Sequence, residues 1–491
     1  MQANAPAPPF DNSYARLPER FFARLPPEPV RAPELVRLNT DLAALLGLDE
    51  AWLRSPEGVA TLAGNHVPDW AEPIAQAYAG HQFGSFVPQL GDGRAILLAE
   101  SCGRDGVRRD IQLKGSGRTP FSRMGDGRAW LGPVLREYVV SEAMHALAVP
   151  TTRSLAVLTT GERVLRESVL PGGILVRVAQ SHVRVGTFQY FAARQDTEAL
   201  ATLVDYVIAR HYPDATGARG LLDAVVAAQA DLVARWMAVG FIHGVMNTDN
   251  TSIAGETIDF GPCAFLDGFD PAKVFSSIDH GGRYAYANQP RIAGWNLARF
   301  AETLLPLLGE SEDEAVAAAQ AGIDAFPPAF DAAYQGRMFD KIGLSRREEG
   351  DADLLSELLT LMADDAADFT LVFRALSSLG NAPGDADGTM RALFASTERL
   401  EAWLARWRAR LALEERDEAA RKAAMKATNP AIIPRNHLVE AVIQSAVMGE
   451  FGPFHALVDA LAEPFADRHE GSPFAVPPRP EQVVMQTFCG T

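Results

Sequence analysis

The sequence predicts an α+β fold in two parts, a β-rich amino-terminal half followed by a helical carboxyl-terminal half. Between about residues 85 and 190, short strand-like runs alternate with glycine-rich turns, which is typical of β-hairpins. Beyond residue 195, apolar residues recur every three or four positions, as in helices that bury one face. A cleft between two such halves is a natural place for a ligand.

Length and composition are those of a globular protein with more than one structural unit. The 491 residues exceed the size at which one hydrophobic core usually keeps growing. A net charge of −17 argues against a general nucleic-acid binder. The three cysteines lack metal-type spacing and indicate a reducing compartment. With no signal-peptide pattern and no run long enough to cross a bilayer, we expect a cytoplasmic protein without a membrane partner.

The first strands can be placed from turn signals. Residues 1–35 are rich in proline and alanine without periodicity, so we expect an extended arm that lies on a domain. Residues 94–100 and 109–114 flank a glycine-containing turn and predict a hairpin whose second strand ends at Lys114. Alternation along this second strand places Lys114 on the face opposite Leu113.

Another hairpin and a helix follow. We expect the hairpin to join residues 155–159 and 163–167 around Thr160 and Gly161, with a further strand at 174–178. Between the two hairpins, residues 132–147 predict a helix that opens near Pro133.

The helical half shows two clear apolar stripes. Their members are Leu200, Leu203, Val204, Val207 and Ile208, and then Val225, Leu232, Val233, Trp236 and Met237. Gly240 follows the second stripe where a helix cap belongs. Further helices are expected near 295–308, 352–377 and 395–427.

The strongest chemical signal is the segment 241–262, FIHGVMNTDNTSIAGETIDFGP. Kinase-type sites place an asparagine and an aspartate together to hold magnesium on nucleotide phosphates, and Asn250 and Asp259 provide these oxygen ligands. We expect the interval between them to form a β-hairpin that joins the two. A polar loop with a chance Asp-Phe-Gly sequence is the alternative interpretation.

One residue that kinases need is missing from this segment. Kinase catalytic loops place the aspartate that accepts the proton five positions before the metal-binding asparagine. Here that position is Val245, which cannot accept a proton. The chain is therefore either an inactive relative of kinases or uses another base, for which Asp249 is the obvious candidate. Ordinary transfer of the γ-phosphate is disfavoured.

Lys114 and Glu137 form a second candidate pair. A strand lysine that pairs with a helix glutamate is how kinase folds present a fixed ammonium group to phosphates. Glu142 lies on the same predicted helix and is a rival partner. Taken alone, a lysine and a glutamate at this spacing are usually surface charges.

Three glycine-rich runs indicate a phosphate pocket. They are Gly91-Asp92-Gly93-Arg94, Gly115-Ser116-Gly117-Arg118 and Gly125-Asp126-Gly127-Arg128. Each alone is more typical of a turn, but together they suit a polyphosphate, because glycines admit close backbone approach and arginines add charged bonds. Arg177 and Arg184 extend this basic group. His182, His211, His243 and His280 show no ligand spacing, and we expect them to be structural.

Four long segments resemble the SelO (YdiU) family. They are QAYAGHQFGSFVPQLGDGRA (76–95), DIQLKGSGRTPFSRMGDGRA (110–129), HGVMNTDNTSIAGETIDFGP (243–262) and GRYAYANQPRIAGWNLARF (282–300). Members of this family are pseudokinases that act as protein adenylyltransferases. The resemblance implies a protein-kinase-like bilobal fold. We then expect an extension at 1–75, a β-rich lobe at 76–192, a helical lobe at 193–428 and a second extension at 429–491.

The resemblance also implies an activity and its residues. AMP would pass from a flipped ATP to Ser, Thr or Tyr hydroxyls of proteins with release of pyrophosphate, using Mg²⁺ or Mn²⁺, and some members use UTP. Asp249 would accept the proton, Asn250 and Asp259 would bind the metal, and Glu137 would hold Lys114. The nucleotide contacts would be Gly91, Gly93, Arg94, Lys114, Asp126, Gly127, Arg177, Arg184 and Asp259.

The carboxyl-terminal cysteine is a further point of resemblance. Cys489 stands where family members often carry a redox-active residue, but residues 274–277 lack the partner cysteine that relatives have. Cys263 is the nearest substitute, and a plain exposed thiol is an equal alternative. We expect a monomer. The alternatives to an adenylyltransferase are an atypical kinase in which Asp249 serves γ-phosphate transfer and a nucleotide-binding scaffold without turnover.

Overall fold

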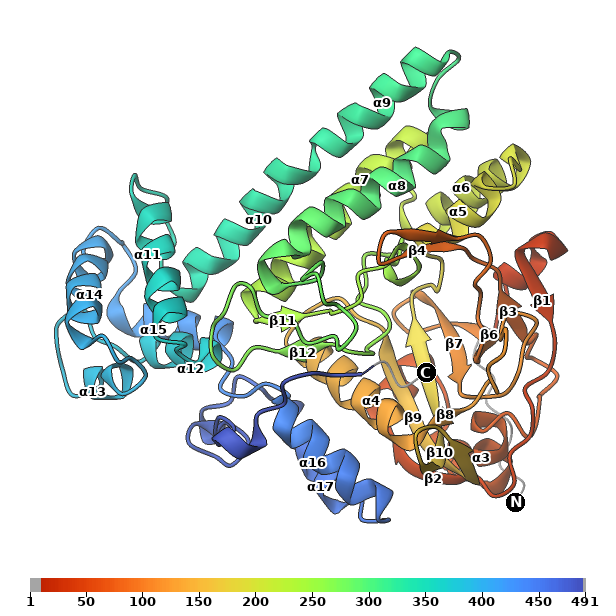
Figure 1. Ribbon diagram of the computed structural model, residues 1–491, viewed down its shortest axis with the longest axis horizontal. Helices are drawn as coiled ribbons and strands as arrows, with labels where there is room; N and C mark the ends of the chain where they lie inside the picture. The colour runs from red at the N-terminus through yellow and green to blue at the C-terminus, as the bar shows by residue number, and fades with distance from the viewer. Residues whose placement is uncertain (1–9, 489–491) are drawn as a thin grey trace.

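The computed structural model describes residues 10–488, which form an antiparallel eight-stranded sheet and a large group of helices beside it (Figure 1). The strand order is β1-β3-β6-β7-β10-β9-β2, with β8 paired to β10. The strands are β1 (Phe22–Arg24), β2 (Glu34–Leu38), β3 (Ile74–Gln76), β6 (Ala95–Cys102), β7 (Arg108–Lys114), β8 (Ala129–Trp130), β9 (Arg153–Leu165) and β10 (Val169–Ala179). The predicted α+β class is confirmed.

The amino-terminal arm is part of the sheet. Strand β1 pairs with β3 at one edge, and β2 pairs with β9 at the other edge. The segment expected to lie on a domain therefore supplies the outer strand β1 and the first two residues of the other outer strand, β2.

One predicted hairpin is confirmed and the other is wrong, because residues 155–159 and 163–165 belong to the same strand, β9. Strands β6 and β7 pair as expected, with Ala95 opposite Lys114. Strand β9, in contrast, continues through Thr160 and Gly161, and the chain reverses only at residues 166–168. The pairing of β9 with β10 is irregular opposite this point, and Gly161 has φ of 66°. The glycine thus makes a bulge rather than a turn.

The first predicted helices are present. Helix α4 (Leu131–Ala146) packs against the sheet through a core that includes Leu135, Val157 and Leu175. The apolar stripes form α6 (Thr197–His211) and α7 (Gly217–Ala238), and Gly240 follows α7 with φ of 73°. The helix expected from residue 295 is α8 (Gln289–Leu308), which begins earlier because Pro290 fits its first turn.

Two long predicted helices are each divided. The first is α11 (Asp351–Asp364) and α12 (Phe369–Leu376), separated where Asp368 caps the second helix by accepting from Leu371 N. The second is α14 (Thr397–Leu411) and α15 (Glu418–Thr428), with Asp417 as the cap. A short polar side chain that satisfies free backbone N–H groups starts a new helix at each point.

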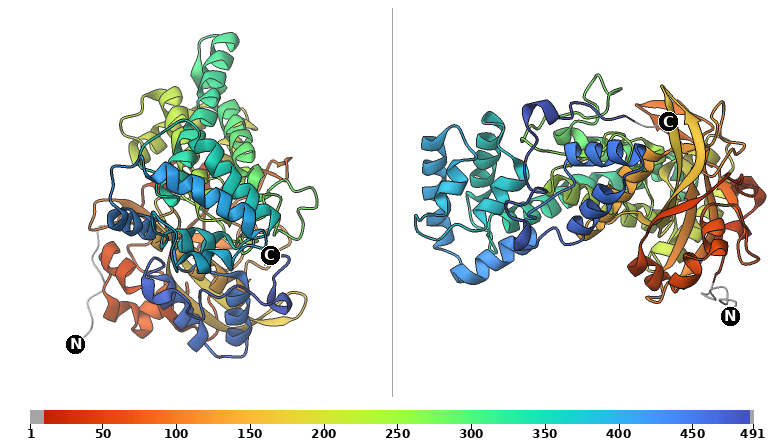
Figure 2. Two further views of the ribbon diagram at one scale, coloured as in Figure 1. Left: turned by 90° about the vertical axis from the view of Figure 1, so that its left-hand side faces the viewer. Right: turned by 90° about the horizontal axis from the view of Figure 1, so that it is seen from below.

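The remaining elements complete the molecule. They are α1 (Thr40–Leu46), α2 (Glu50–Leu53), α3 (Pro56–Leu62), β4 (Gly80–Gln82), β5 (Ser85–Val87), α5 (Val185–Ala192), β11 (Phe241–Ile242), β12 (Ala264–Phe265), α9 (Glu312–Asp324), α10 (Phe326–Lys341), α13 (Asp387–Arg391), α16 (Asn436–Val447) and α17 (Gly452–Leu461). Helices α11 to α15 lie at one end and the sheet at the other (Figure 2). Within residues 10–488, every helix is too short or too polar to cross a lipid bilayer.

Candidate functional site

The site begins with charged side chains on one face of the sheet. Lys114 at the end of β7 reaches Glu137 of α4, with Nζ 2.6 Å from Oε2, and Asp259, with Nζ 3.0 Å from Oδ1. Arg177 of β10 lies opposite Gln112 in the antiparallel register and therefore shares the Lys114 face. Its Nη2 is 2.6 Å from Glu137 Oε1 and 3.7 Å from Asp259 Oδ1.

Glu137, Lys114 and Arg177 are buried, whereas the Asp259 side chain is 30% exposed at the edge of this cluster. Glu137 is 1% exposed and Lys114 is 8% exposed. Burial by itself raises the pKa of Asp259, but the positive charges of Lys114, Arg177, Arg184 and Arg94 together lower that pKa far below its usual range. Burial likewise raises the pKa of Glu137, and the charges of Arg177 and Lys114 lower it below its usual value. Both carboxylates are therefore ionised at neutral pH.

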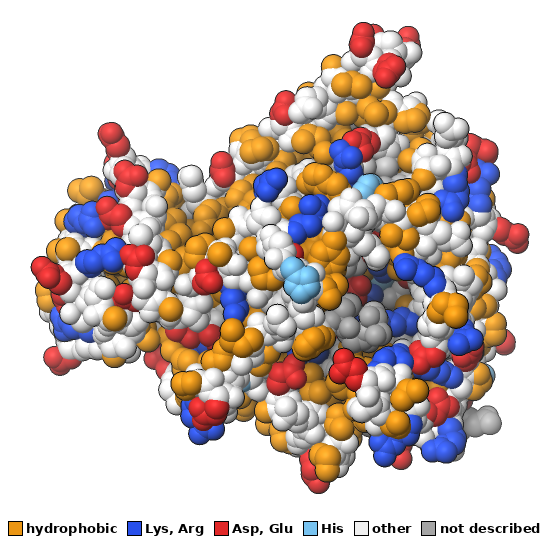
Figure 3. All heavy atoms as spheres, in the orientation of Figure 1, with side chains coloured by type: hydrophobic (Ala, Val, Ile, Leu, Met, Phe, Trp, Pro, Cys, Tyr) orange, Lys and Arg blue, Asp and Glu red, His pale blue; other side chains and the backbone are white. Residues whose placement is uncertain are grey.

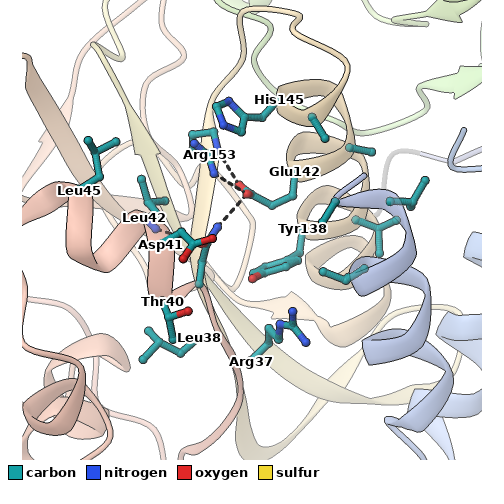
Figure 4. A pocket seen from close by; sticks show the side chains of 17 residues that line it. Arg37, Leu38, Thr40, Asp41, Leu42, Leu45, Tyr138, Glu142, His145 and Arg153 are labelled. Atoms are coloured by element: carbon teal, nitrogen blue, oxygen red, sulfur yellow. Dashed lines mark hydrogen bonds and ion pairs between the residues drawn. The ribbon is translucent and has the colours of Figure 1, made fainter. Parts of the chain in front are cut away.

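The rival partner of Lys114 faces away from this cluster. Glu142 accepts bonds from Arg153 Nη2 and Asn39 Nδ2, both at 2.7 Å. Figure 4 shows these residues around a cavity of about 700 Å³ that lies between α1, α4 and α17. Glu142 thus belongs to a separate polar cluster with Arg153 and Asn39, away from Lys114.

Asp249 lies in a short helical turn, residues 248–250, and is 6% exposed. Its Oδ2 accepts a hydrogen bond of 3.0 Å from Gln82 Nε2, whereas its Oδ1 is buried with no hydrogen-bond partner. Burial raises the pKa of Asp249 to about 6. The carboxylate is therefore poised near neutral pH, with one oxygen available to a further group.

Asn250 is fixed through its amide nitrogen. The Nδ2 atom donates to the carbonyl of Val245 at 3.0 Å, which leaves Oδ1 for another partner. The hairpin expected between Asn250 and Asp259 is absent from the described chain. Ser252 instead forms a bridge with Arg184, and Thr257 forms one with Thr151. Because residues far away in sequence hydrogen-bond to the backbone of this segment, its N–H and C=O groups find partners without a hairpin.

The first glycine-rich run packs against the loop that follows the second run, at Thr119 and Phe121. A Cβ atom on Gly91 would overlap the Phe121 ring, and one on Gly93 would lie 2.9 Å from the Phe121 carbonyl oxygen. Thr119 Oγ1 donates to the Asp92 carbonyl at 2.7 Å. These glycines therefore allow two loops to pack directly on one another.

The third glycine-rich run is hydrogen-bonded to the second run, but the side chain of its aspartate, Asp126, points away from the Lys114 cluster. Gly117 N donates to the Gly127 carbonyl at 3.1 Å. Asp126 forms an ion pair of 2.8 Å with Arg166, in the turn between β9 and β10, and its side chain is 41% exposed. Asp126 thus contacts a strand turn rather than the Lys114 cluster. On the face drawn in Figure 3, Lys and Arg side chains lie along a hollow between the sheet and the helices.

Arg184 joins the loop of Asp249 to the glycine-rich run at Gly91. Its Nη1 donates to the Asp249 carbonyl at 2.9 Å, and its Nη2 lies 3.7 Å from Asp92 Oδ1. The guanidinium carbon lies 4.4 Å from the centre of the Tyr78 ring. No sequence pattern predicted a role for Asp92 or Tyr78.

The β4–β5 hairpin was also missed. Gln82 contacts Asp249, and a Cβ atom on Gly80 would overlap the same carboxylate. His81 N donates to Thr248 Oγ1 at 2.6 Å, and Phe83 N donates to Asn247 Oδ1 at 3.0 Å. These residues lie inside the quoted segment 76–95, but a contact with a loop some 165 positions later leaves no local pattern.

The buried histidines have internal partners. His182 Nδ1 lies 2.9 Å from Asp110 Oδ2, and His243 Nε2 lies 2.9 Å from the Ile258 carbonyl oxygen. His211 is half-buried, and desolvation lowers its pKa to about 3. These three have structural surroundings, whereas His280 is exposed.

Cys489 lies outside the described residues. Just before it, Thr487 N donates to the Phe275 carbonyl at 2.8 Å and Thr487 Oγ1 donates to the Pro262 carbonyl at 2.6 Å. Cys263 is buried, and burial raises its pKa to about 12. Its thiol is therefore protonated and unreactive at neutral pH.

Comparison with known proteins identifies relatives over the whole length. A family described as "Protein adenylyltransferase SelO" matches residues 7–462. A protein named "Protein nucleotidyltransferase YdiU" from Rhodopseudomonas palustris is 61% identical over 488 residues, which is 98% of this chain and 99% of the relative. Proteins of the same name from Bradyrhizobium diazoefficiens and Methylorubrum populi are 61% and 60% identical, each over 98% of this chain and 99% of the relative.

Proposed function

The chain belongs to the SelO family of protein adenylyltransferases and is a protein nucleotidyltransferase, and we propose how its residues carry out this reaction. Nucleotide phosphates would contact Lys114, Arg177, Arg184 and Arg94, whose charges already gather around Asp259. The backbone of the loops at Gly91, Gly93 and Gly127 would lie against the phosphate chain, with Asp126 at the outer end of this pocket. Glu137 holds Lys114 in place for this contact.

Asp249 would accept the proton in the transfer step. The hydroxyl oxygen of a Ser, Thr or Tyr side chain attacks the α-phosphorus of ATP, and its proton passes to Asp249 Oδ1. The bond from the α-phosphorus to the α–β bridging oxygen breaks, and pyrophosphate leaves with the electron pair. Support comes from the free Oδ1 atom and from Val245, the apolar residue at the kinase base position.

Asn250 and Asp259 fit a divalent cation, which would be Mg²⁺ or Mn²⁺. The amide nitrogen of Asn250 is bound to Val245, so its oxygen is available, and Asp259 is ionised. No group of three or more His, Cys, Asp or Glu side chains within residues 10–488 could hold a metal alone. Phosphate oxygens would therefore complete the ligand set, and the cation would neutralise their charge.

We also propose a protein-kinase-like arrangement of two lobes. The lobes would span residues 76–192 and 193–428, with extensions at 1–75 and 429–491. Support comes from the ion pair between a strand lysine and a helix glutamate, Lys114 and Glu137, beside the Asp-Phe-Gly sequence that starts at Asp259.

One observation carries the proposal: Asp249, which directly precedes the proposed metal ligand Asn250, has one buried carboxylate oxygen, Oδ1, without a hydrogen-bond partner. The test is to incubate the protein with Mg²⁺, a mixture of acceptor proteins and ATP labelled at either the α- or the γ-phosphate. Label retained on protein from the α-position supports adenylylation. Label retained from the γ-position indicates a kinase, and nucleotide binding with no label retained indicates a scaffold. Parallel reactions with UTP test the second nucleotide.

A further inference from the structure

Arg283 is a cation without a carboxylate partner in the described part of the chain. No ion pair within residues 10–488 includes it, and its Nε is buried with no hydrogen-bond partner. Asp279, in the same loop, is already bonded by the backbone N–H groups of Arg283 and Tyr284 at 2.9 and 2.8 Å. Most arginines of this acidic protein have such partners, so the positive charge of Arg283 remains available to another molecule.

Aromatic rings hold this guanidinium in place. Its central carbon lies 4.7 Å from the centre of the Trp295 ring and 5.7 Å from that of Tyr284. Arg299 lies 5.2 Å from the same Trp295 ring. A guanidinium stacked on aromatic rings loses little further freedom when it binds an anion.

The patch extends onto the β4–β5 hairpin. The His81 ring lies 5.3 Å from Trp295 and 4.9 Å from Phe86, which is 41% exposed. We call His81, Phe86, Arg283, Trp295 and Arg299 the Arg283 patch. It combines Arg283, Arg299, which forms an ion pair with Glu302, and the exposed Phe86 ring, and arginine and aromatic side chains are enriched where proteins bind proteins.

The patch is directly connected to the loop of Asp249. A Cβ atom on Gly84, in the hairpin turn, would lie 3.6 Å from the guanidinium carbon of Arg283. Two residues earlier in this hairpin, Gln82 contacts the Asp249 carboxylate. Tyr284, adjacent to Arg283, donates its hydroxyl hydrogen to Asn247 at 2.7 Å. A peptide lying on the patch would therefore be close to the proposed proton acceptor.

We propose that the Arg283 patch binds an acidic segment of the acceptor protein, placing an Asp or Glu near the hydroxyl that is modified. This inference rests on the proposed function of Asp249. A net charge of −17 repels acidic segments from most of the surface, so a local cationic patch beside the site selects where they bind. The Arg283 guanidinium can donate two parallel hydrogen bonds to one carboxylate.

The first test is a binding measurement that needs no catalysis. The probes are fluorescein-labelled peptides with one threonine flanked by Asp and Glu, or by Asn and Gln, or by Lys, and the readout is fluorescence anisotropy with the full-length protein. We expect the acidic peptide to bind the parent about tenfold more tightly than the neutral one, the value of one charge-assisted bond. Arg283→Gln should lose this preference, Arg283→Lys should keep part of it, and Arg283→Glu should prefer the Lys peptide.

The control is Arg399→Gln, which removes the same charge from α14 at the opposite end of the molecule (Figure 1). It should bind all three peptides like the parent. Equal binding of the acidic and neutral peptides by the parent, or an unchanged preference in Arg283→Glu, overturns the proposal.

The second test separates docking from nucleotide binding. With α-labelled ATP and the same peptides, Arg283→Gln should raise KM for the acidic peptide about tenfold and leave kcat and the affinity for ATP unchanged. A lower affinity for ATP would instead place Arg283 in the nucleotide pocket and contradict the proposal. If the parent binds the acidic peptide selectively but transfers no α-label, the proposed reaction fails while the docking surface stands.

Discussion

Two buried lysines allow a matched test of the phosphate pocket. Lys114 lies between Glu137 and Asp259 at 2.6 and 3.0 Å, whereas Lys341 in α10 faces the Phe373 ring at 4.4 Å. Both are at most 8% exposed. The same substitution, Lys→Met, therefore removes a paired charge in one variant and an unpaired charge in the other.

Lys114→Met should weaken ATP binding and destabilise the fold. A charge-assisted bond to phosphate contributes about 1.5–3 kcal/mol, so we expect the dissociation constant to rise about tenfold to a hundredfold. The substitution also leaves the buried Glu137 carboxylate and the partly exposed Asp259 carboxylate with one cation fewer. The cost of removing one partner from such a group is about 3 kcal/mol in the free energy of unfolding.

Lys341→Met should have the opposite effect on stability and none on ATP. Burial lowers the pKa of Lys341 from 10.5 to about 7. That difference corresponds to a cost of about 5 kcal/mol for keeping the buried group charged at lower pH, which the methionine removes. ATP affinity is measured by titration calorimetry and stability by urea denaturation. The reasoning is refuted if Lys114→Met binds ATP like the parent, or if Lys341→Met weakens ATP binding as much.

Four further outcomes follow from the same geometry. Asp249→Asn should keep ATP affinity and lower transfer of α-label by about 10²–10⁴-fold, and unchanged transfer would remove Asp249 as the base. Asp259→Ala should abolish metal-dependent ATP binding, and calorimetry showing parental affinity for Mg·ATP would disprove the metal assignment. Gly80→Ala should lower kcat by displacing the Asp249 carboxylate, while parental kcat would show that the hairpin does not position it. Because the pKa of Lys341 is lower in the folded protein than in the unfolded chain, the unfolded chain binds more protons between pH 7 and 10.5. The free energy of unfolding of the parent should therefore rise by about 1.4 kcal/mol for each unit of pH increase over this window. Lys341→Met should lack that rise in urea denaturation.

Local patterns predicted the elements that carry the site. Alternation along β7 placed Lys114 on the correct face, and the helix predicted over residues 132–147 from Pro133 contains Glu137, so both elements that carry the ion pair were predicted. The segment holding Asp249, Asn250 and Asp259 was recognised from residue types that suit metal-assisted chemistry.

Long-range pairing limited what the sequence could predict. The Asn250 to Asp259 interval has hairpin-like composition, but its backbone bonds to segments near Thr151 and Arg184 instead. Gly161 carries a turn signal, yet the sheet accommodates it as a bulge. The contact of Gln82 with Asp249 joins positions 167 apart in the chain, and only tertiary structure reveals it.

The central claim is that the α-phosphorus of ATP, rather than the γ-phosphorus, faces Asp249. A crystal structure of the protein with Mg²⁺ and a non-hydrolysable ATP analogue measures this directly. We predict that the α-phosphorus is the phosphorus nearest Asp249 Oδ1, with the outer phosphates beside Lys114 and Arg177. A γ-phosphorus nearest Asp249 would contradict the account.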